Sequence, residues 1–473
     1  MIFSSIVFLL YFLPLFLLVY HVVPKQFKNL IILLGSIIFY SWGAPQFIFI
    51  IIVSTYIDFH IVRQLYNTSA IKIRKVLLTL SISINLGLLA YFKYSNFFVS
   101  NLNSLLSTLG FSEMPWVEVA LPIGISFYTF QTLTYSIDVY RKTSEPLNNV
   151  LDYMVYIMSF PQMIAGPIVR FNAIANQIVN RVEIADDKLI GFYRFCIGLS
   201  KKVLIANVLA EQADIIFDGD LINLSTTAAW IGIFAYTFQI YFDFSGYSDM
   251  AIGLGRILGF RFPENFKSPY VSQSISEFWR RWHITLGEFM KDYLYIPLGG
   301  NRVSSKYRLF FNLWLVFILS GLWHGSEWNF ILWGAYHGLF LILDRIFLLR
   351  FLKKIGVVMA TLFTFFIVMI GWVIFRLDSI SDIQLYLVSL FNFDFQLEPS
   401  VIPAFWTITI LAVIFSFCTN FKAGKDLETF FFKTHTYHVK HHLILTLLSV
   451  ILFILCLSSI TSSGFNPFIY FRF

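Results

Sequence analysis

The stretch SGLWHG, residues 320–325, places a histidine between two long apolar runs. Residues 310–319 precede it and residues 330–343 follow it, and apolar side chains dominate both. We therefore expect His324 at or near membrane depth. An ionisable group is costly to bury there, and its presence indicates a functional site. The alternative is a structural histidine that donates a hydrogen bond to a backbone carbonyl at a helix break.

The composition is that of a protein that crosses a membrane many times. Hydrophobic residues make up 58% of the chain, charged residues 13%, and the mean hydropathy is +0.73, whereas soluble proteins carry about 25% charged residues. The sequence predicts an all-α, polytopic membrane protein with about 10–13 spanning or re-entrant helices around a central tunnel. We expect one membrane domain over residues 1–473. The apolar runs are residues 2–22, 30–56, 76–98, 117–135, 153–168, 191–209, 228–257, 309–323, 329–348, 357–375, 405–418 and 443–460.

The basic residues indicate which loops face the cytoplasm. The net charge of +7 arises mainly from loops, so it does not indicate a nucleic-acid partner. Basic clusters at residues 63–75, 345–354 and 422–440 are predicted to be cytoplasmic by the positive-inside rule. Residues 377–401 carry four acidic residues and no Lys or Arg, and we expect this segment to face outward. The first apolar run lacks a basic start and a cleavage site, which predicts a retained helix.

A polar segment at about residues 261–306 interrupts the apolar pattern. It begins with a turn-rich loop and continues with FWRRWHITL, residues 278–286. Trp279 and Trp282 fall on an apolar stripe opposite Arg280 and Arg281, which predicts a cytoplasm-facing amphipathic or re-entrant helix. Such a segment suits an anionic cytosolic ligand such as a CoA thioester. It equally suits a helix that only anchors the protein to membrane lipid.

Further polar residues lie inside apolar runs. Asp243 and Asp249 interrupt the run 228–257, and Gln131 lies in the run 117–135. Broken helices and polar groups at membrane depth are tolerated where they are buried in protein or line a wet cavity. The sequence therefore predicts a central cavity near His324. From the residues alone, that cavity is compatible with either transport or catalysis.

Several motifs, in this order, resemble the membrane-bound O-acyltransferase family, and most closely its branch of bacterial alginate O-acetylation proteins. The resemblance covers nearly the whole chain. The motifs are FYSWG at residues 39–43, LPIGISFYTFQ at 121–131, FPQMIAGPI at 160–168, DFSGYSD at 243–249, FWRRWHITL at 278–286, GLWHG at 321–325 and WGAYHG at 333–338.

The resemblance implies an acyltransferase that passes acetyl from cytosolic acetyl-CoA across the bilayer. The family's essential histidine matches His324, and a second implicated histidine matches His283. A neutral imidazole can accept the proton of an attacking hydroxyl, which contributes about 10²–10⁴-fold to the rate. Whether His324 acts as a base or carries the acetyl group stays open. The candidate supporting residues are His337, Asp243, Asp249 and Gln131, and the candidate tunnel residues are Trp323, Trp282, Arg280 and Arg281.

The resemblance also implies partners. The expected acceptor is a cell-envelope polysaccharide, either alginate-type or peptidoglycan, reached directly or through a separate extracytoplasmic transferase of the same pathway. The expected location is the bacterial cytoplasmic (inner) membrane. The rival hypothesis is a secondary transporter or flippase of an envelope precursor, built from the same broken helices.

The remaining motifs predict neither a permanently bound cofactor nor a metal site. The sequence contains no Walker A pattern, dinucleotide fingerprint or HExxH motif, which weighs against ATP-driven pumps and metalloproteases. A histidine-rich stretch at residues 435–442 has spacing that would suit a metal, but no Cys, Asp or Glu joins it. We therefore expect a cytoplasmic loop at this stretch and no metal ion.

Overall fold

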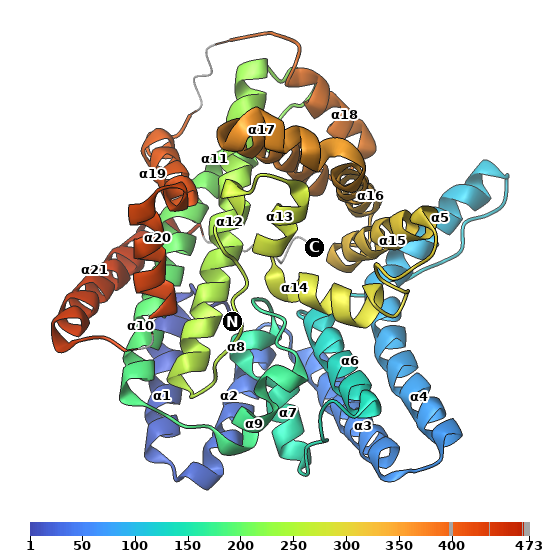
Figure 1. Cartoon of the computed structure of the whole chain (residues 1–473), viewed down its shortest axis with the longest axis vertical. Coiled ribbons are helices and arrows are strands. Elements are labelled where there is room, and N and C mark those ends of the chain that lie inside the picture. Colours follow the sequence, from blue (N-terminus) through green and yellow to red (C-terminus); the bar gives the residue numbers. More distant parts are fainter. Residues whose placement is uncertain (397–400, 435, 466, 468–473) are drawn as a thin grey trace. The chain divides into compact units, whose positions relative to one another are not determined.

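The computed structural model describes residues 1–473 except 397–400, 435, 466 and 468–473. Every regular element within the described residues is a helix (Figure 1), which confirms the predicted all-α fold. The chain divides into two compact units. We call residues 1–184 with 255–263 the N-terminal unit, and residues 185–254 with 264–473 the C-terminal unit.

The N-terminal unit is a set of helices joined by turns and loops, the longest of them over residues 109–124, and is seen in blue to teal in Figure 1. Within it α3 packs on α4, α4 on α6, and α2 on α7. Its helices are α1 (Leu13–Val22), α2 (Lys28–Ser41), α3 (Ile48–Asn67), α4 (Ile71–Leu89), α5 (Ser95–Thr108), α6 (Ile125–Arg141), α7 (Val150–Met158), α8 (Phe160–Met163) and α9 (Phe171–Asn180).

A buried carboxylate links three helices of the N-terminal unit. Asp58 of α3 is 1% exposed and accepts hydrogen bonds from the Ser81 hydroxyl of α4 and, at 2.7 Å, from the Tyr153 hydroxyl of α7. Asn85 of α4 donates to the same carboxylate at 3.2 Å. A charge buried in an apolar surrounding is stable only when it is paired or hydrogen-bonded. The neutral donors around Asp58 meet that requirement.

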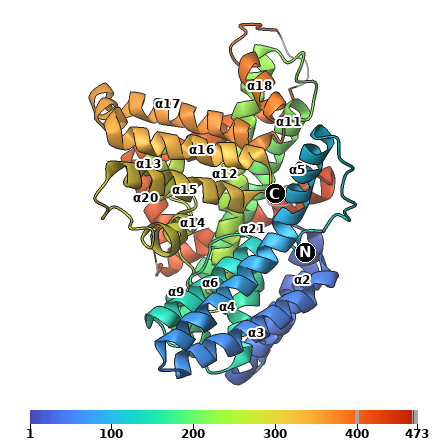
Figure 2. The same cartoon turned by 90° about the vertical axis from the view of Figure 1, so that its right-hand side faces the viewer.

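The C-terminal unit contains the longest helices of the chain (Figure 2). Short π-helical segments interrupt or extend several of them, among them Lys201–Ala206 between α10 and α11. The helices are α10 (Ala185–Ser200), α11 (Asn207–Phe217), α12 (Thr226–Ile257), α13 (Ile275–Arg281), α14 (Ile284–Phe289), α15 (Lys306–His324), α16 (Trp328–Leu343), α17 (Leu349–Arg376), α18 (Ile380–Ser389), α19 (Phe405–Phe417), α20 (Lys422–Glu428) and α21 (Val439–Ser463).

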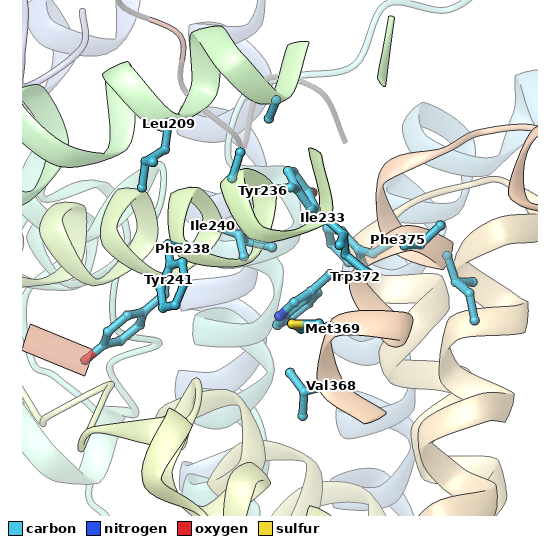
Figure 3. Close-up of a cluster of buried hydrophobic side chains, with 14 of the residues drawn as sticks. Leu209, Ile233, Tyr236, Phe238, Ile240, Tyr241, Val368, Met369, Trp372 and Phe375 are labelled. Carbon is cyan, nitrogen blue, oxygen red and sulfur yellow. The ribbon is translucent and has the colours of Figure 1, made fainter. Parts of the chain in front are cut away.

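The core of the C-terminal unit forms where α12 and α17 contribute large apolar side chains. Figure 3 shows Trp372 and Phe375 of α17 beside Ile233 and Tyr236 of α12. Trp372 is 1% exposed and Tyr236 is also 1% exposed. Burying one large apolar side chain contributes about 1.5–3 kcal/mol, so this cluster fixes α17 against α12. Helix α17 ends at Arg376, the residue after Phe375.

Helices α15 and α16 form a tight hairpin because glycines line their contact. A Cβ at Gly334 would lie 2.3 Å from the carbonyl oxygen of Phe317, and one at Gly321 would lie 2.1 Å from that of Phe330. Real side chains do not approach a backbone so closely, so only glycine permits this separation. The hairpin matters for function because His324 is the last residue of α15.

Charged pairs join the α10–π segment to α12 within the C-terminal unit. Asp243 of α12 pairs with Lys202 at 3.0 Å, and both side chains are 2% exposed. Asp249, one and a half turns later, pairs with Arg194 at 2.8 Å and with Lys201 at 2.7 Å. Both aspartates therefore connect one helix to another.

By length and composition, four helices of the described chain can cross a membrane, or five when a bent pair counts as one. These are residues 45–67, 71–108, 328–376 and 439–463, with the bent pair at 405–433. A multi-pass membrane protein is thereby confirmed. Of the other predicted runs, 228–257 lies within α12 and 309–323 within α15, while several others are divided between shorter helices. The run 153–168, for example, is divided between α7 and α8, which begins with Phe160-Pro161.

Two predicted elements differ from the structure. The run 117–135 is helical only from Ile125, because Gly124 adopts a positive φ of 77° and residues 111–122 form no regular secondary structure. The single amphipathic helix expected around residues 276–286 is divided into α13 and α14 at Trp282-His283. A hydropathy pattern does not predict such breaks, because each depends on the backbone conformation of one or two residues.

The close α15–α16 contact predicts the effect of adding one methyl group. We expect Gly334→Ala to lower stability by about 1–3 kcal/mol, because the new Cβ must push the two helices apart. The matched control is Gly87→Ala in α4, where nothing lies within 4 Å of the new Cβ and alanine is the better helix former. Thermal unfolding in detergent measures both variants. Equal melting temperatures for the two would contradict the tight contact.

The buried Lys202–Asp243 pair predicts a rescue experiment. Asp243→Leu alone leaves a buried, unpaired ammonium group, and we expect a loss of about 3–5 kcal/mol. The double variant Lys202→Met with Asp243→Leu removes both charges and should recover most of the folded protein. Fluorescence size-exclusion chromatography of detergent extracts measures the recovery. A double variant as unstable as the single one would show that Asp243 has another essential partner.

Candidate active site

His283 lies at a left-handed turn between two short helices. Ser274 caps the start of α13 through its hydroxyl, which accepts the Glu277 N–H at 3.1 Å, and α13 ends at Arg281. His283 then adopts φ 45° and ψ 52° before α14 begins at Ile284. For a residue with a side chain this conformation costs roughly 1–2 kcal/mol. Such strain concentrates at functional sites.

The His283 imidazole is buried and held by an amide. Its side chain is 1% exposed, and the Phe244 ring lies edge-on at 4.7 Å between ring centroids. Nδ1 lies 3.0 Å from Oδ1 of Asn265, while Nε2 has no hydrogen-bond partner among the described residues. Burial lowers the pKa of His283 to about 3, because it disfavours the charged form. The imidazole is therefore neutral at physiological pH.

His324 lies against aromatic rings at the end of α15. Its ring centroid is 4.8 Å from that of Trp323, 5.2 Å from that of Trp333 and 5.4 Å from that of Phe375. The centroids of His324 and His283 are 6.4 Å apart. Trp323 also contacts His283, at 5.9 Å. The structure therefore brings the two sequence-predicted histidines together inside an aromatic enclosure.

His337 lies on the far side of Trp333 from this pair. The Trp333 centroid is 5.0 Å from that of His337 and 5.2 Å from that of His324. Trp279 covers His337 at 5.1 Å, and Gly371 leaves room for its ring. His337 is fully buried, and neither ring nitrogen has a hydrogen-bond partner in the described part of the chain. His337 therefore packs behind the aromatic rings of the enclosure and forms part of its wall.

The other sequence-predicted residues lie in different surroundings. Asp243 and Asp249 form the helix-to-helix pairs described above, and Gln131 is buried in the N-terminal unit. Arg280 is exposed on α13.

Two further candidate tunnel residues lie at the end of α13, next to the break in the predicted helix. Arg281 pairs with Glu277 at 2.8 Å, one turn earlier on α13. The Trp282 ring packs into the core against Trp372 at 4.8 Å and Phe266 at 5.1 Å. Trp323 is thus the predicted tunnel residue whose ring contacts both histidines.

A small pocket of about 70 Å³, with both polar and apolar lining, adjoins the amide that holds His283. Basic and acidic side chains line it together, and Phe432 lies over both Arg194 and Lys201 at 5.1 Å each. The lining includes Arg194, Lys201, Ser248, Asp249, Asn265 and Lys433. Arg194 pairs with Asp249 and Glu264, Lys201 with Asp249, and Lys433 with Glu428. The pocket therefore presents charged groups of both signs beside Ser248 and Asn265.

Sequence reasoning did not identify Asn265, Thr285 or Trp333 as parts of this site. Asn265 follows Pro263-Glu264 in a turn-rich loop, where asparagine is common for local reasons. Nothing in the sequence relates it to a histidine 18 positions later. Trp333 lies in the WGAYHG motif, but its position between His324 and His337 follows only from the α15–α16 hairpin.

The arrangement suits proton transfer rather than metal binding. Among the described residues, no three His, Cys, Asp or Glu side chains gather as possible ligands of a metal ion. His435 of the histidine-rich stretch lies outside the described residues, and His442 bonds to the Tyr193 hydroxyl at 3.1 Å. Two buried imidazoles among aromatic rings are suited to accept protons from a reacting hydroxyl.

Comparison with known proteins agrees with this chemistry. Residues 77–381 match the family model described as MBOAT, membrane-bound O-acyltransferase family. The probable alginate O-acetylase of Azotobacter vinelandii is 43% identical over 395 residues, which are 83% of this chain and 78% of the relative. That of Pseudomonas aeruginosa is 42% identical over 83% of this chain and 75% of its own.

A third relative is named for a different acceptor. The peptidoglycan O-acetyltransferase of Helicobacter pylori is 36% identical over 421 residues, which are 81% of this chain and 78% of the relative. The matched region of the family model includes His283, His324 and His337. On these findings, this chain belongs to the membrane-bound O-acyltransferase family and is an acyltransferase.

Proposed function

We propose that this protein is an O-acetyltransferase of the bacterial cytoplasmic (inner) membrane. It takes acetyl from cytosolic acetyl-CoA and passes it on for O-acetylation of an extracytoplasmic cell-envelope polysaccharide. The observation that carries the proposal is the pair of buried imidazoles, His283 and His324, 6.4 Å apart within aromatic walls. The similarity to O-acetyltransferases over most of the chain supports the same reaction.

His324 is assigned as the general base. It accepts the proton of the acceptor hydroxyl while the hydroxyl oxygen bonds to the thioester carbonyl carbon. The carbon–sulfur bond then breaks, and the leaving thiolate takes the proton back from His324. The products are an acetyl ester and the free thiol of CoA. A neutral imidazole fits this exchange, because it can accept the hydroxyl proton and return it to the leaving thiolate.

The remaining residues of the enclosure position the reactants. His283 is a second neutral proton acceptor, and Trp323 and Trp333 exclude water from the thioester. Excluding water matters because a thioester is already activated and would otherwise hydrolyse. His337 supports the wall through its contacts with Trp279 and Trp333.

The charge pattern supports a cytosolic donor. The basic segments at residues 345–354 and 422–440 are expected on the cytoplasmic side by the positive-inside rule, and Lys433 of the latter lines the pocket beside Asn265. Phosphate groups of CoA are attracted by such lysines and arginines. Donor entry from this side leaves the acidic, outward-facing segment after α17 for the acceptor side. The proposed partner there is an extracytoplasmic transferase of the same pathway.

The acceptor is assigned by similarity. Two relatives with about 43% identity are named for alginate, and one with 36% identity is named for peptidoglycan. We therefore propose an alginate-type exopolysaccharide as the first acceptor to test and peptidoglycan as the second.

Thioester turnover by the purified protein in nanodiscs tests the reaction. With acetyl-CoA, acceptor glycan and the outer transferase supplied, we expect His324→Ala to reduce CoA release by about 10²–10⁴-fold, the usual contribution of a general base. The matched control is His60→Ala, which makes the same change at an exposed histidine of α3 and should leave turnover unchanged.

Other outcomes would contradict the proposal in distinct ways. CoA release that persists in a folded His324→Ala variant would move the base to another residue, with His283 next in order. A wild-type protein that releases no CoA under these conditions, but carries ions or an envelope precursor across the bilayer, would establish the transporter hypothesis instead.

A further inference from the structure

The side chain of Asn265 is fixed by four hydrogen bonds. It is 1% exposed in the loop that follows α12. Its Oδ1 accepts the Thr285 hydroxyl at 2.8 Å and the Thr285 backbone N–H at 3.3 Å. Its Nδ2 donates to the Ser248 hydroxyl of α12 at 3.1 Å. The fourth contact is Oδ1 to Nδ1 of His283 at 3.0 Å.

These contacts determine which way the amide points. A backbone N–H can only donate, so the atom that Thr285 N meets must be the amide oxygen. The amide oxygen is an acceptor, so Nδ1 of His283 must carry the hydrogen. Nε2 then holds a lone pair, because a neutral imidazole has one donor and one acceptor nitrogen. This nitrogen is the one without a partner among the described residues.

The backbone reinforces the same geometry. The Ile284 N–H donates to the Asn265 carbonyl oxygen at 3.0 Å, which ties the residue after His283 to the loop that carries the amide. His283 is thereby held in its left-handed conformation from both sides. The ring has little freedom to rotate and exchange its two nitrogens.

We propose that Asn265 is a positioning residue that holds His283 as the Nδ1–H tautomer, so that Nε2 serves as a fixed hydrogen acceptor in acetyl transfer. The inference deepens the proposed function and rests on it for the reaction, but not for the tautomer. A neutral amide in this position orients the imidazole without stabilising its charged form. A carboxylate would do both, as in the dyads of serine hydrolases.

Two substitutions of Asn265 separate orientation from charge. Asn265→Leu keeps the shape and removes the acceptor, and we expect kcat to fall by about 10²–10⁴-fold with KM for acetyl-CoA changed less than about twofold. Asn265→Asp supplies a carboxylate that favours the imidazolium form. Its rate should fall as the pH drops below neutral, over a range where the wild-type rate is unaffected by His283 ionisation.

The control is Asn312→Asp, which makes the same change at a fully buried asparagine of α15. Asn312 donates to the Leu298 carbonyl oxygen at 3.1 Å and does not contact the histidine pair. Its pH profile should match that of the wild type. Thr285→Val provides a milder variant if Asn265→Leu does not fold, because it removes one donor to Oδ1 and retains the shape. It should lower kcat by a smaller factor.

Nitrogen-15 NMR of histidine-labelled protein in nanodiscs reads the tautomer without any activity. The His283 signal is assigned by its loss in His283→Gln. We expect Nδ1 protonated and Nε2 unprotonated in the wild type, and a mixture of tautomers in Asn265→Leu.

The outcomes separate the two proposals. The expected tautomer together with the kcat loss supports both. The expected tautomer in a protein without thioester turnover supports the positioning of His283 and overturns the acetyl-transfer proposal. A wild-type His283 protonated on Nε2, or an Asn265→Leu variant with wild-type kcat, would overturn the role of Asn265.

Discussion

The constraint on which the site depends is the burial of uncharged imidazoles among aromatic rings. An imidazolium in that enclosure would lose its hydration without gaining a counter-charge, so His283 stays neutral and available as an acceptor. Trp323 contacts both histidines, and Phe375 places the α12–α17 core directly behind His324. The packing of the C-terminal unit therefore also determines the protonation state of His283.

Two features of the backbone, the glycines between α15 and α16 and the left-handed turn at His283, bring those rings into contact. Glycines at 321 and 334 let α15 and α16 approach until Trp333 lies against His324, while the left-handed turn at His283 re-aims the chain between α13 and α14. The acidic residues near the site, Asp243 and Asp249, hold helices together. Asp243 and Asp249 bind the lysines and the arginine of α10 and its π segment, which keeps α12 in register behind Phe244 and His283.

The sequence predicted the all-α membrane fold because hydropathy is averaged over about 20 residues and survives local errors. His324 was predictable because an ionisable residue between apolar runs is conspicuous. Asn265 was not, since its role depends on a loop meeting a turn 18 residues later. The break at Trp282-His283 also escaped prediction, because amphipathic periodicity continues through it. The partners of Asp243 depended on the π segment at Lys201–Ala206, which has no sequence signature.

We propose that acetyl transfer takes place between His283 and His324. A cryo-electron microscopy structure with an acetyl-CoA analogue in which a methylene replaces the sulfur tests this placement, because the analogue cannot react. We expect the ketone carbon between the two imidazoles, about 3–3.5 Å from the position of an attacking hydroxyl beside His324, with the nucleotide toward Lys433. An analogue bound with its ketone away from both imidazoles would show that transfer takes place elsewhere.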